Sequence, residues 1–233
     1  MKKIILVIVV LLVANNAFSQ AKFGIKAGVN FSSLSDVEYS STDGTLRFIK
    51  FKNDEMATGY HVGVFANVSL GKIISFQPEL LFSMQGGKMQ YYELPVGDYE
   101  GVIGSSGLAA TLKLTYQLGY IQIPLLLEIK PVADLGVLFG PQLSFNVSRK
   151  CTSTYDGYTE TFSGSRFYYL CGTGFKKRDV SLVFGLQYTF IEKIVIGARY
   201  NLGLINNWDY ANTYDKSKGW KSSVIQASLG YLF

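Results

Sequence analysis

Apolar and polar residues alternate one by one through most of the chain, and the C-terminal segment Lys221–Phe233 shows this pattern most clearly. From residue 225 onward, one face of this segment carries apolar side chains, namely Ile225, Ala227, Leu229, Tyr231 and Phe233. Gln226, Ser228 and Gly230 fall on the other face, because successive side chains of a strand point to opposite sides. A strand that ends on an aromatic residue is typical of a transmembrane β-barrel, which places aromatic side chains at the membrane interface. We therefore interpret this segment as the strand that closes a barrel against its first strand.

The same alternation predicts eight strands, at residues 23–31, 60–70, 74–84, 112–129, 135–146, 179–190, 194–203 and 221–233. The apolar parity changes near Gly119–Tyr120, which predicts a β-bulge. Short connections are expected at Gly71–Lys72, Lys130–Ala133 and Ile191–Lys193, the first as a two-residue hairpin. They alternate with long polar stretches at residues 32–57, 86–110, 148–177 and 206–219. This rhythm predicts an all-β, eight-stranded antiparallel up-and-down transmembrane β-barrel, with both termini periplasmic and the long loops external.

A soluble eight-stranded barrel with its apolar face inside, as in the lipocalins, is the alternative fold. The polar face argues against it, because Gly, Ser, Asn, Gln and Thr dominate there and Lys and Glu are few. Small polar residues suit a narrow lumen better than a solvated surface. Aromatic residues also lie near the strand ends of the apolar face, as the interface girdles of a membrane barrel require. Both features favour the outer membrane and its lipid as the environment.

The N-terminal segment has the three parts of a secretory signal. Lys2 and Lys3 precede the apolar run Ile4–Val13, and Ala17 and Ser19 occupy the cleavage positions. The apolar run is shorter than the about 20 residues that span a membrane as a helix. We therefore expect a signal peptide at residues 1–19 and a barrel domain at 20–233, rather than an N-terminal core helix. The absence of a cysteine after the cleavage site disfavours a lipoprotein anchor.

The charge balance of the chain argues against a nucleic-acid partner and excludes little else. The chain has 22 Lys and Arg against 17 Asp and Glu, a formal net charge of +5. Removing the two signal lysines leaves +3, which is too mild to favour a nucleic-acid partner. Cys151 and Cys171 are the two cysteines, and in an exported protein they are most simply a disulfide that staples a loop. Two free thiols or half of a metal site are the alternatives. The chain has a single histidine, which makes a metal site the weaker hypothesis, and we predict no metal and no cofactor.

Four segments resemble the PorT-like outer-membrane β-barrels of Bacteroidetes, and they are spread over residues 20–233. The segments are 23–34, 76–82, 120–128, and 198–204 together with 230–233, and the most specific stretch runs from Ile123 to Leu127. The resemblance implies an eight-stranded outer-membrane barrel. The namesake of the family is needed for protein export by the type IX route. The resemblance therefore also implies a partner among secretion or envelope proteins. Most members of this family have no assigned role.

Eight strands enclose a lumen that side chains just fill, so we expect no open pore. The inward parity places charged residues in the half of the lumen near the short turns, namely Lys26, Glu79, Glu128 and Arg199. Buried charges are tolerated when they are paired, so we predict an ionic cluster that plugs the barrel. Gln77, Gln187 and Gln226 are its expected hydrogen-bond partners. A proton or ion path is the alternative role of this cluster.

The long loops are the better place for recognition, since rigid scaffolds position binding residues on loops. They are rich in aromatic residues, and the candidate contacts are Tyr91, Tyr92, Tyr155, Tyr158, Trp208 and Tyr210. Such loops suit protein or glycan contact, but they also suit a sheet that simply continues above the membrane. His61, the single histidine, is inward-facing, and an enzyme that modifies lipids through it is a distant third reading. We expect a barrel without catalytic activity, either an accessory of secretion or envelope assembly or a surface adhesion or ligand-binding protein.

Overall fold

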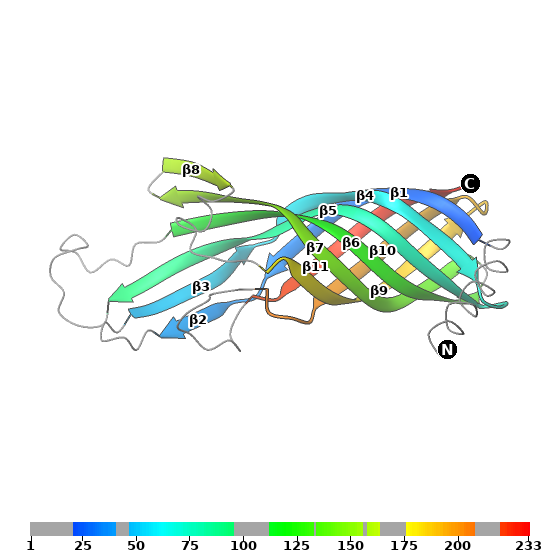
Figure 1. Cartoon of the computed structure of the whole chain (residues 1–233), viewed down its shortest axis with the longest axis horizontal. Helices are drawn as coiled ribbons and strands as arrows, with labels where there is room; N and C mark the ends of the chain where they lie inside the picture. Colours follow the sequence, from blue (N-terminus) through cyan, green and yellow to red (C-terminus); the bar gives the residue numbers. More distant parts are fainter. Residues whose placement is uncertain are drawn as a thin grey trace, which may run out of the picture.

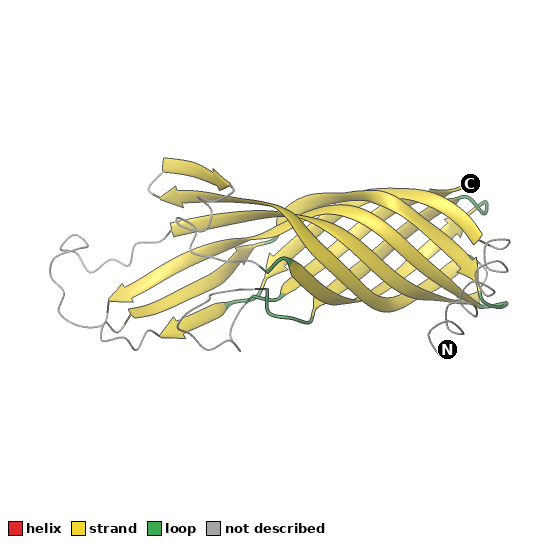
Figure 2. Cartoon of the chain, in the orientation of Figure 1, coloured by secondary structure: helices red, strands yellow, loops and turns green. Residues whose placement is uncertain are grey.

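A closed antiparallel β-barrel forms the body of the molecule (Figures 1 and 2). The computed structural model describes residues 21–40, 47–95, 112–132, 134–155, 158–163, 176–207 and 220–233. Within these ranges, eight strands make up the barrel: β1 (Ala21–Leu34), β4 (Ala57–Ser69), β5 (Ile74–Pro95), β6 (Leu112–Val132), β7 (Leu135–Tyr155), β9 (Arg178–Phe190), β10 (Ile194–Gly203) and β11 (Ser222–Leu232). The predicted fold class, an eight-stranded antiparallel barrel, is confirmed.

Every barrel strand pairs with its neighbours in the chain, so the topology is up-and-down. The order is β1-β4-β5-β6-β7-β9-β10-β11, and β11 returns to β1. This closing ladder runs from Gly24 opposite Leu232 to Leu34 opposite Ser222. Closure leaves no strand edge exposed along the barrel, which a bilayer requires because its core offers no water to unpaired backbone groups. The predicted role of the C-terminal strand is therefore confirmed.

The two faces of the strands divide as the alternation predicts. On β1, Ile25 and Val29 face outward with 50% and 45% of their surface exposed, whereas Lys26 and Asn30 face the lumen with 4% and 0% exposed. The register shift between Gly119 and Tyr120 on β6 confirms the predicted bulge. Within the described residues, no helix is long and apolar enough to cross a membrane.

The barrel ends differ in the length of their connections. At what we call the turn end, β9 and β10 are joined by Ile191–Lys193, as expected, and Lys193 N donates to Phe190 O at 3.0 Å. The connection from β4 to β5 is wider than the predicted two-residue hairpin. It contains residues 70–73, and Leu70 N donates to Ile74 O at 2.9 Å. The apolar residues on both sides of Gly71–Lys72 hid this wider turn from the sequence pattern.

At the opposite end, which we call the loop end, the sheet continues beyond the barrel. Here β5 runs to Pro95 and β7 to Tyr155, where the sequence pattern predicted loops from residues 86 and 148. Three further strands join them: β2 (Val37–Ser40), β3 (Arg47–Glu55) and β8 (Tyr158–Ser163). The loop predictions were wrong here because backbone pairing needs no apolar face, so the alternation stops while the strands go on. Together β2-β3-β5-β6-β7-β8 form a one-sided sheet, the loop-end sheet, which projects from the rim (Figure 1).

Candidate functional site

The carboxylate of Glu79 is the centre of an ionic cluster in the lumen. Its Oε1 accepts a hydrogen bond from Lys26 Nζ at 2.7 Å, and its Oε2 accepts one from Arg199 Nη1 at 2.9 Å. These three residues come from β5, β1 and β10 and are buried, with 4–5% of their surface exposed. Gln77 Nε2 adds a further hydrogen bond to Glu79 Oε1 at 2.7 Å. The carboxylate thus satisfies two buried cations that would otherwise be very costly.

Glu128, the other predicted carboxylate, lies beside this cluster but has different partners. Its two oxygens accept hydrogen bonds from Asn67 Nδ2 and Gln187 Nε2, both at 2.6 Å. Lys130 Nζ lies 3.5 Å from Glu128 Oε2 and reaches partly into solvent. The neighbouring strand leaves room for the carboxylate at Gly136, where a Cβ would come within 2.2 Å of Glu128 Oε1. Gln187 also donates to Gln77, so the two carboxylates share one network.

A neutral network fills the lumen above the charges, toward the loop end. Asn30 Oδ1 lies 2.7 Å from His61 Nδ1 and accepts a hydrogen bond from Gln226 Nε2 at 2.9 Å. The Asn30 amide in turn donates to Ser83 Oγ at 2.9 Å. Asn201 Nδ2 donates to Gln226 Oε1 at 3.1 Å. His61 Nδ1 therefore contacts an amide oxygen, and an amide does not form a nucleophile and base pair with a histidine, so this contact does not support the hypothesis of an enzyme.

The structure brings together most of the residues that the sequence placed in the ionic plug. Lys26, Glu79 and Arg199 touch directly, and Gln77 and Gln187 join them, but Gln226 belongs to the neutral network instead. Sequence reasoning missed two further members. Asn67 has the same parity as His61 on β4, so the alternation could have found it, whereas Lys130 falls in a segment that was assigned to a turn.

Apolar side chains close the lumen at both ends. Phe65, Val195 and Leu232 cluster at the turn end, with the Lys26 ammonium 4.7 Å from the centre of the Phe65 ring. At the loop end, Trp220 is fully buried, and its ring centre lies 5.5 Å from that of Tyr116. We call Trp220 and Tyr116 the apolar cap, and Leu34, Ala57, Met89, Leu114 and Leu118 are also buried. Between these ends the lumen is mainly polar, and Leu126, Leu138 and Val183 form a further buried apolar cluster inside it.

Polar contacts hold the loop-end sheet together above the cap. Lys88 Nζ lies 2.7 Å from Glu55 Oε2, and this hydrogen bond and the nearby positive charge hold the pKa of the exposed Glu55 carboxyl below its usual value. The hydroxyls of Thr152 and Thr161 pair across β7 and β8 at 3.1 Å. Of the predicted aromatic contacts, Tyr91, Tyr92, Tyr155 and Tyr158 lie on strands of this sheet, whereas Trp208 and Tyr210 lie outside the described residues.

Only one of the two cysteines of the predicted disulfide lies within the described residues. Cys151 lies on β7, is fully buried and pairs in register with Tyr116 on β6 and Phe162 on β8. Cys171 lies outside the described residues, so the link between them stays a prediction.

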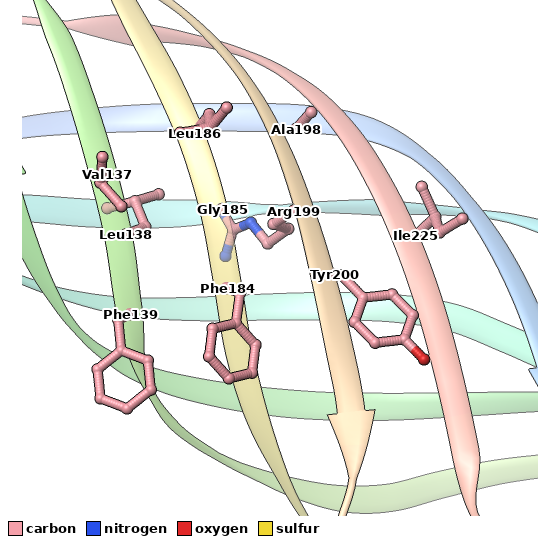
Figure 3. Close-up of a pocket in the computed structure, with 10 residues that line it drawn as sticks. All are labelled: Val137, Leu138, Phe139, Phe184, Gly185, Leu186, Ala198, Arg199, Tyr200 and Ile225. Carbon is pink, nitrogen blue, oxygen red and sulfur yellow. The ribbon is translucent and has the colours of Figure 1, made fainter.

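A hollow of about 510 Å³ lies on the outer wall of the barrel (Figure 3). Phe139, Phe184 and Tyr200 stand on β7, β9 and β10, and the rings of the two phenylalanines are 5.3 Å apart. Ala198, whose side chain is small, leaves the space between the larger side chains unfilled. The lining is apolar and continuous with the outward face, so this hollow faces the hydrocarbon of the membrane.

The closed barrel, with its apolar outer band and polar, filled interior, defines an outer-membrane β-barrel protein. The chain belongs to the family described as outer membrane protein beta-barrel domain, whose model matches residues 14–209. No curated protein matches the sequence significantly.

Solved structures with a similar barrel include the attachment invasion locus protein Ail of Yersinia pestis, with 14% identity, coverage of 92% of this chain and 99% of that one, and a TM-score of 0.42. Neisserial surface protein A has 11% identity, coverage of 91% and 99%, and a TM-score of 0.46. OprG from Pseudomonas aeruginosa has 14% identity, coverage of 91% and 96%, and a TM-score of 0.45.

Proposed function

We propose that this barrel is a non-catalytic scaffold that presents the loop-end sheet to a protein partner at the cell surface. The observation that carries the proposal is the continuation of β5, β6 and β7 past the barrel, where β2, β3 and β8 widen them into a paired sheet. A sheet anchored by three barrel strands is a rigid platform, and rigid platforms suit recognition. In this proposal the turn end and both chain termini are periplasmic, and the loop end is external.

The contents of the lumen support a scaffold rather than a channel. An ionic cluster, a neutral network and apolar layers fill the barrel along its axis. Barrels of eight strands have an interior that side chains can fill completely. The polar residues of the interior therefore serve stability, and recognition is left to the surface beyond the rim.

The resemblance to PorT-like barrels supports a more specific version, in which the bound protein is a secreted substrate or a component of the envelope assembly machinery. Membership of the PorT-like group, the cleaved signal and the Cys151–Cys171 link belong to the same proposal. In it the disulfide would join Cys151, at the base of the β7–β8 hairpin, to the segment that follows β8. That link would stiffen the platform.

The test is deletion of the sheet without damage to the barrel. Removing residues 153–160 joins Thr152 to Thr161, which already face each other across the β7–β8 hairpin. Removing residues 38–50 likewise joins Val37 to Phe51, which are register partners on β2 and β3. The wild-type barrel and both deletions, placed in lipid nanodiscs, are incubated with the proteins secreted by the producing cells. The matched control replaces Ile191 and Glu192 at the turn end with Asn and Gly.

The proposal predicts that the wild type and the control retain the same bound protein and that the deletions lose it while keeping their thermal unfolding. Equal retention by all four proteins contradicts it. A comparison of the secreted proteomes of cells with and without the gene then distinguishes a role in secretion from binding of a surface ligand. Loss of a set of exported proteins supports the secretion role, and an unchanged set leaves a surface ligand.

A further inference from the structure

A small cavity lies inside the lumen between the neutral network and the apolar cap. Its walls come from strands β5, β7, β9, β10 and β11, and the lining residues are Gln85, Gln142, Asp179, Ser181, Asn201, Ser222 and Val224. Its volume of about 10 Å³ corresponds to roughly one water-sized sphere. The cavity is separate from the ionic cluster around Glu79, and the proposed surface function does not use it.

The wall of this cavity is rich in oxygen atoms without partners. Gln85 Oε1, Gln142 Oε1, Asp179 Oδ1 and Asn201 Oδ1 are buried and accept no hydrogen bond from the described residues. All four side chains are at least nine-tenths buried, with 2–6% of their surface exposed. Buried acceptors without a donor are costly, about 1–3 kcal/mol each. Their convergence on one cavity points to a species that satisfies several oxygens at once.

Neighbouring contacts involve the N–H groups of two of the amides. Gln142 Nε2 donates to Ser144 Oγ at 3.3 Å and to Ser181 Oγ at 3.2 Å. Asn201 Nδ2 donates to the oxygen of Gln226 at 3.1 Å. Asn201 is oriented through Gln226 and Asn30, because the Asn30 amide donates to Tyr60 O at 3.0 Å and its oxygen accepts from Gln226. The serine hydroxyls can donate or accept, and with Gln142 oriented as in these contacts its oxygen faces the cavity. The wall therefore presents acceptors, which match a cation.

The charge of the wall comes from Asp179. Among the ion pairs of the described residues, none joins this aspartate to a lysine or arginine. The other oxygen-bearing side chains of the cavity are neutral amides and hydroxyls. An ionised Asp179 thus leaves about one negative charge to be balanced within the lumen, and buried charges require such compensation.

We infer that this cavity binds one small monovalent cation, with sodium as the best fit, through Gln85, Gln142, Asp179 and Asn201. One water molecule could donate only two hydrogen bonds and would leave two acceptors unpaired, whereas one cation coordinates all four oxygens. A calcium ion would bring a second positive charge that the wall does not balance, and it prefers six to eight oxygens. The bound ion would tie β5 and β7 to β9 and β10 just below the loop-end sheet.

The test compares the wild-type barrel refolded in detergent in sodium, potassium, calcium or N-methylglucamine chloride at equal ionic strength. We expect sodium to raise the thermal midpoint by on the order of 5 °C over N-methylglucamine, which is too large for the cavity. Asp179→Asn should abolish this difference. Asp134→Asn removes the same charge at an exposed position at the turn end and should keep the difference. Equilibrium dialysis with radioactive sodium should show about one ion per wild-type chain.

Equal midpoints in sodium and N-methylglucamine, together with no retained sodium, would overturn the inference and leave a water or a protonated Asp179 in the cavity. A calcium effect larger than that of sodium would overturn the monovalent assignment. If the Asp179→Asn protein does not fold, the comparison of salts and the dialysis of the wild type still decide the question, because neither needs a variant.

Discussion

Replacing Glu79 with glutamine removes the negative charge between two buried cations and keeps a side chain of similar size. In the wild type, Glu79 accepts hydrogen bonds from Lys26 at 2.7 Å and from Arg199 at 2.9 Å, and all three side chains are almost fully buried. The variant leaves Lys26 and Arg199 in one lumen without a counter-charge between them. Removing one partner of a buried ion pair costs about 3–5 kcal/mol, so we expect a loss of this size in the free energy of unfolding.

The assay is equilibrium unfolding in urea, with the barrel in detergent micelles and its β-structure followed by circular dichroism. Linear extrapolation gives the free energy of unfolding for each variant. Glu55→Gln is the matched control, because it breaks the exposed pair with Lys88 outside the barrel and should leave stability nearly unchanged. In a Lys26→Met background, Glu79→Gln should cost about 1–3 kcal/mol less, since one stranded cation is gone.

A Glu79→Gln variant as stable as the wild type would refute the role of the ionic cluster. So would an unchanged melting temperature after neutralising Glu79 and Glu128 together. Strict additivity of Lys26→Met and Glu79→Gln would show that the two residues act independently, despite the short distance between them.

Further predictions concern local packing and strand connections. Gly136→Ala should destabilise the barrel by about 1–3 kcal/mol, because its Cβ would meet the Glu128 carboxylate, whereas Gly71→Ala, which has nothing within 4 Å, should be neutral in the same urea assay. Ile191 and Glu192 have φ angles of 49° and 57°, so replacing them with Asn and Gly should stabilise the barrel by about 1–2 kcal/mol; a loss of stability would contradict a strained turn. After proteolysis without reductant, mass spectrometry should find the two cysteine-containing peptides as one linked species that separates only on reduction, and unlinked peptides without reductant would rule out the disulfide.

The sequence predicts the barrel well because the membrane demands a repeating pattern. Outward residues such as Ile25 must be apolar and inward residues such as Lys26 are polar, so parity alone assigns each side chain to a face. The loop-end sheet escaped prediction because β2, β3 and β8 lie beyond that pattern. Backbone pairing alone leaves little trace in the residue types.

The sequence predicted which side chains face the lumen, but not which of them contact one another. Parity showed that Lys26, Glu79 and Arg199 point inward, and the charge rule predicted that they pair. Which inward residues meet depends on the stagger of the strands. Lys26 lies opposite Gly63 and Gly230 in register, so its contact with Glu79 crosses to the second strand away. That stagger also brings Gln226 to Asn30 rather than to the ionic cluster, and no feature of a single sequence encodes it.

The measurement that most directly tests the scaffold account is the ion conductance of the purified barrel in a planar lipid bilayer. A lumen filled by the ionic cluster, the neutral network and the apolar cap should give no sustained current steps. A porin of about 16 strands, measured in the same bilayer, serves as the positive control, because barrels of that size leave an aqueous channel. Regular, sustained steps from the wild type would contradict the sealed lumen and make the protein a channel.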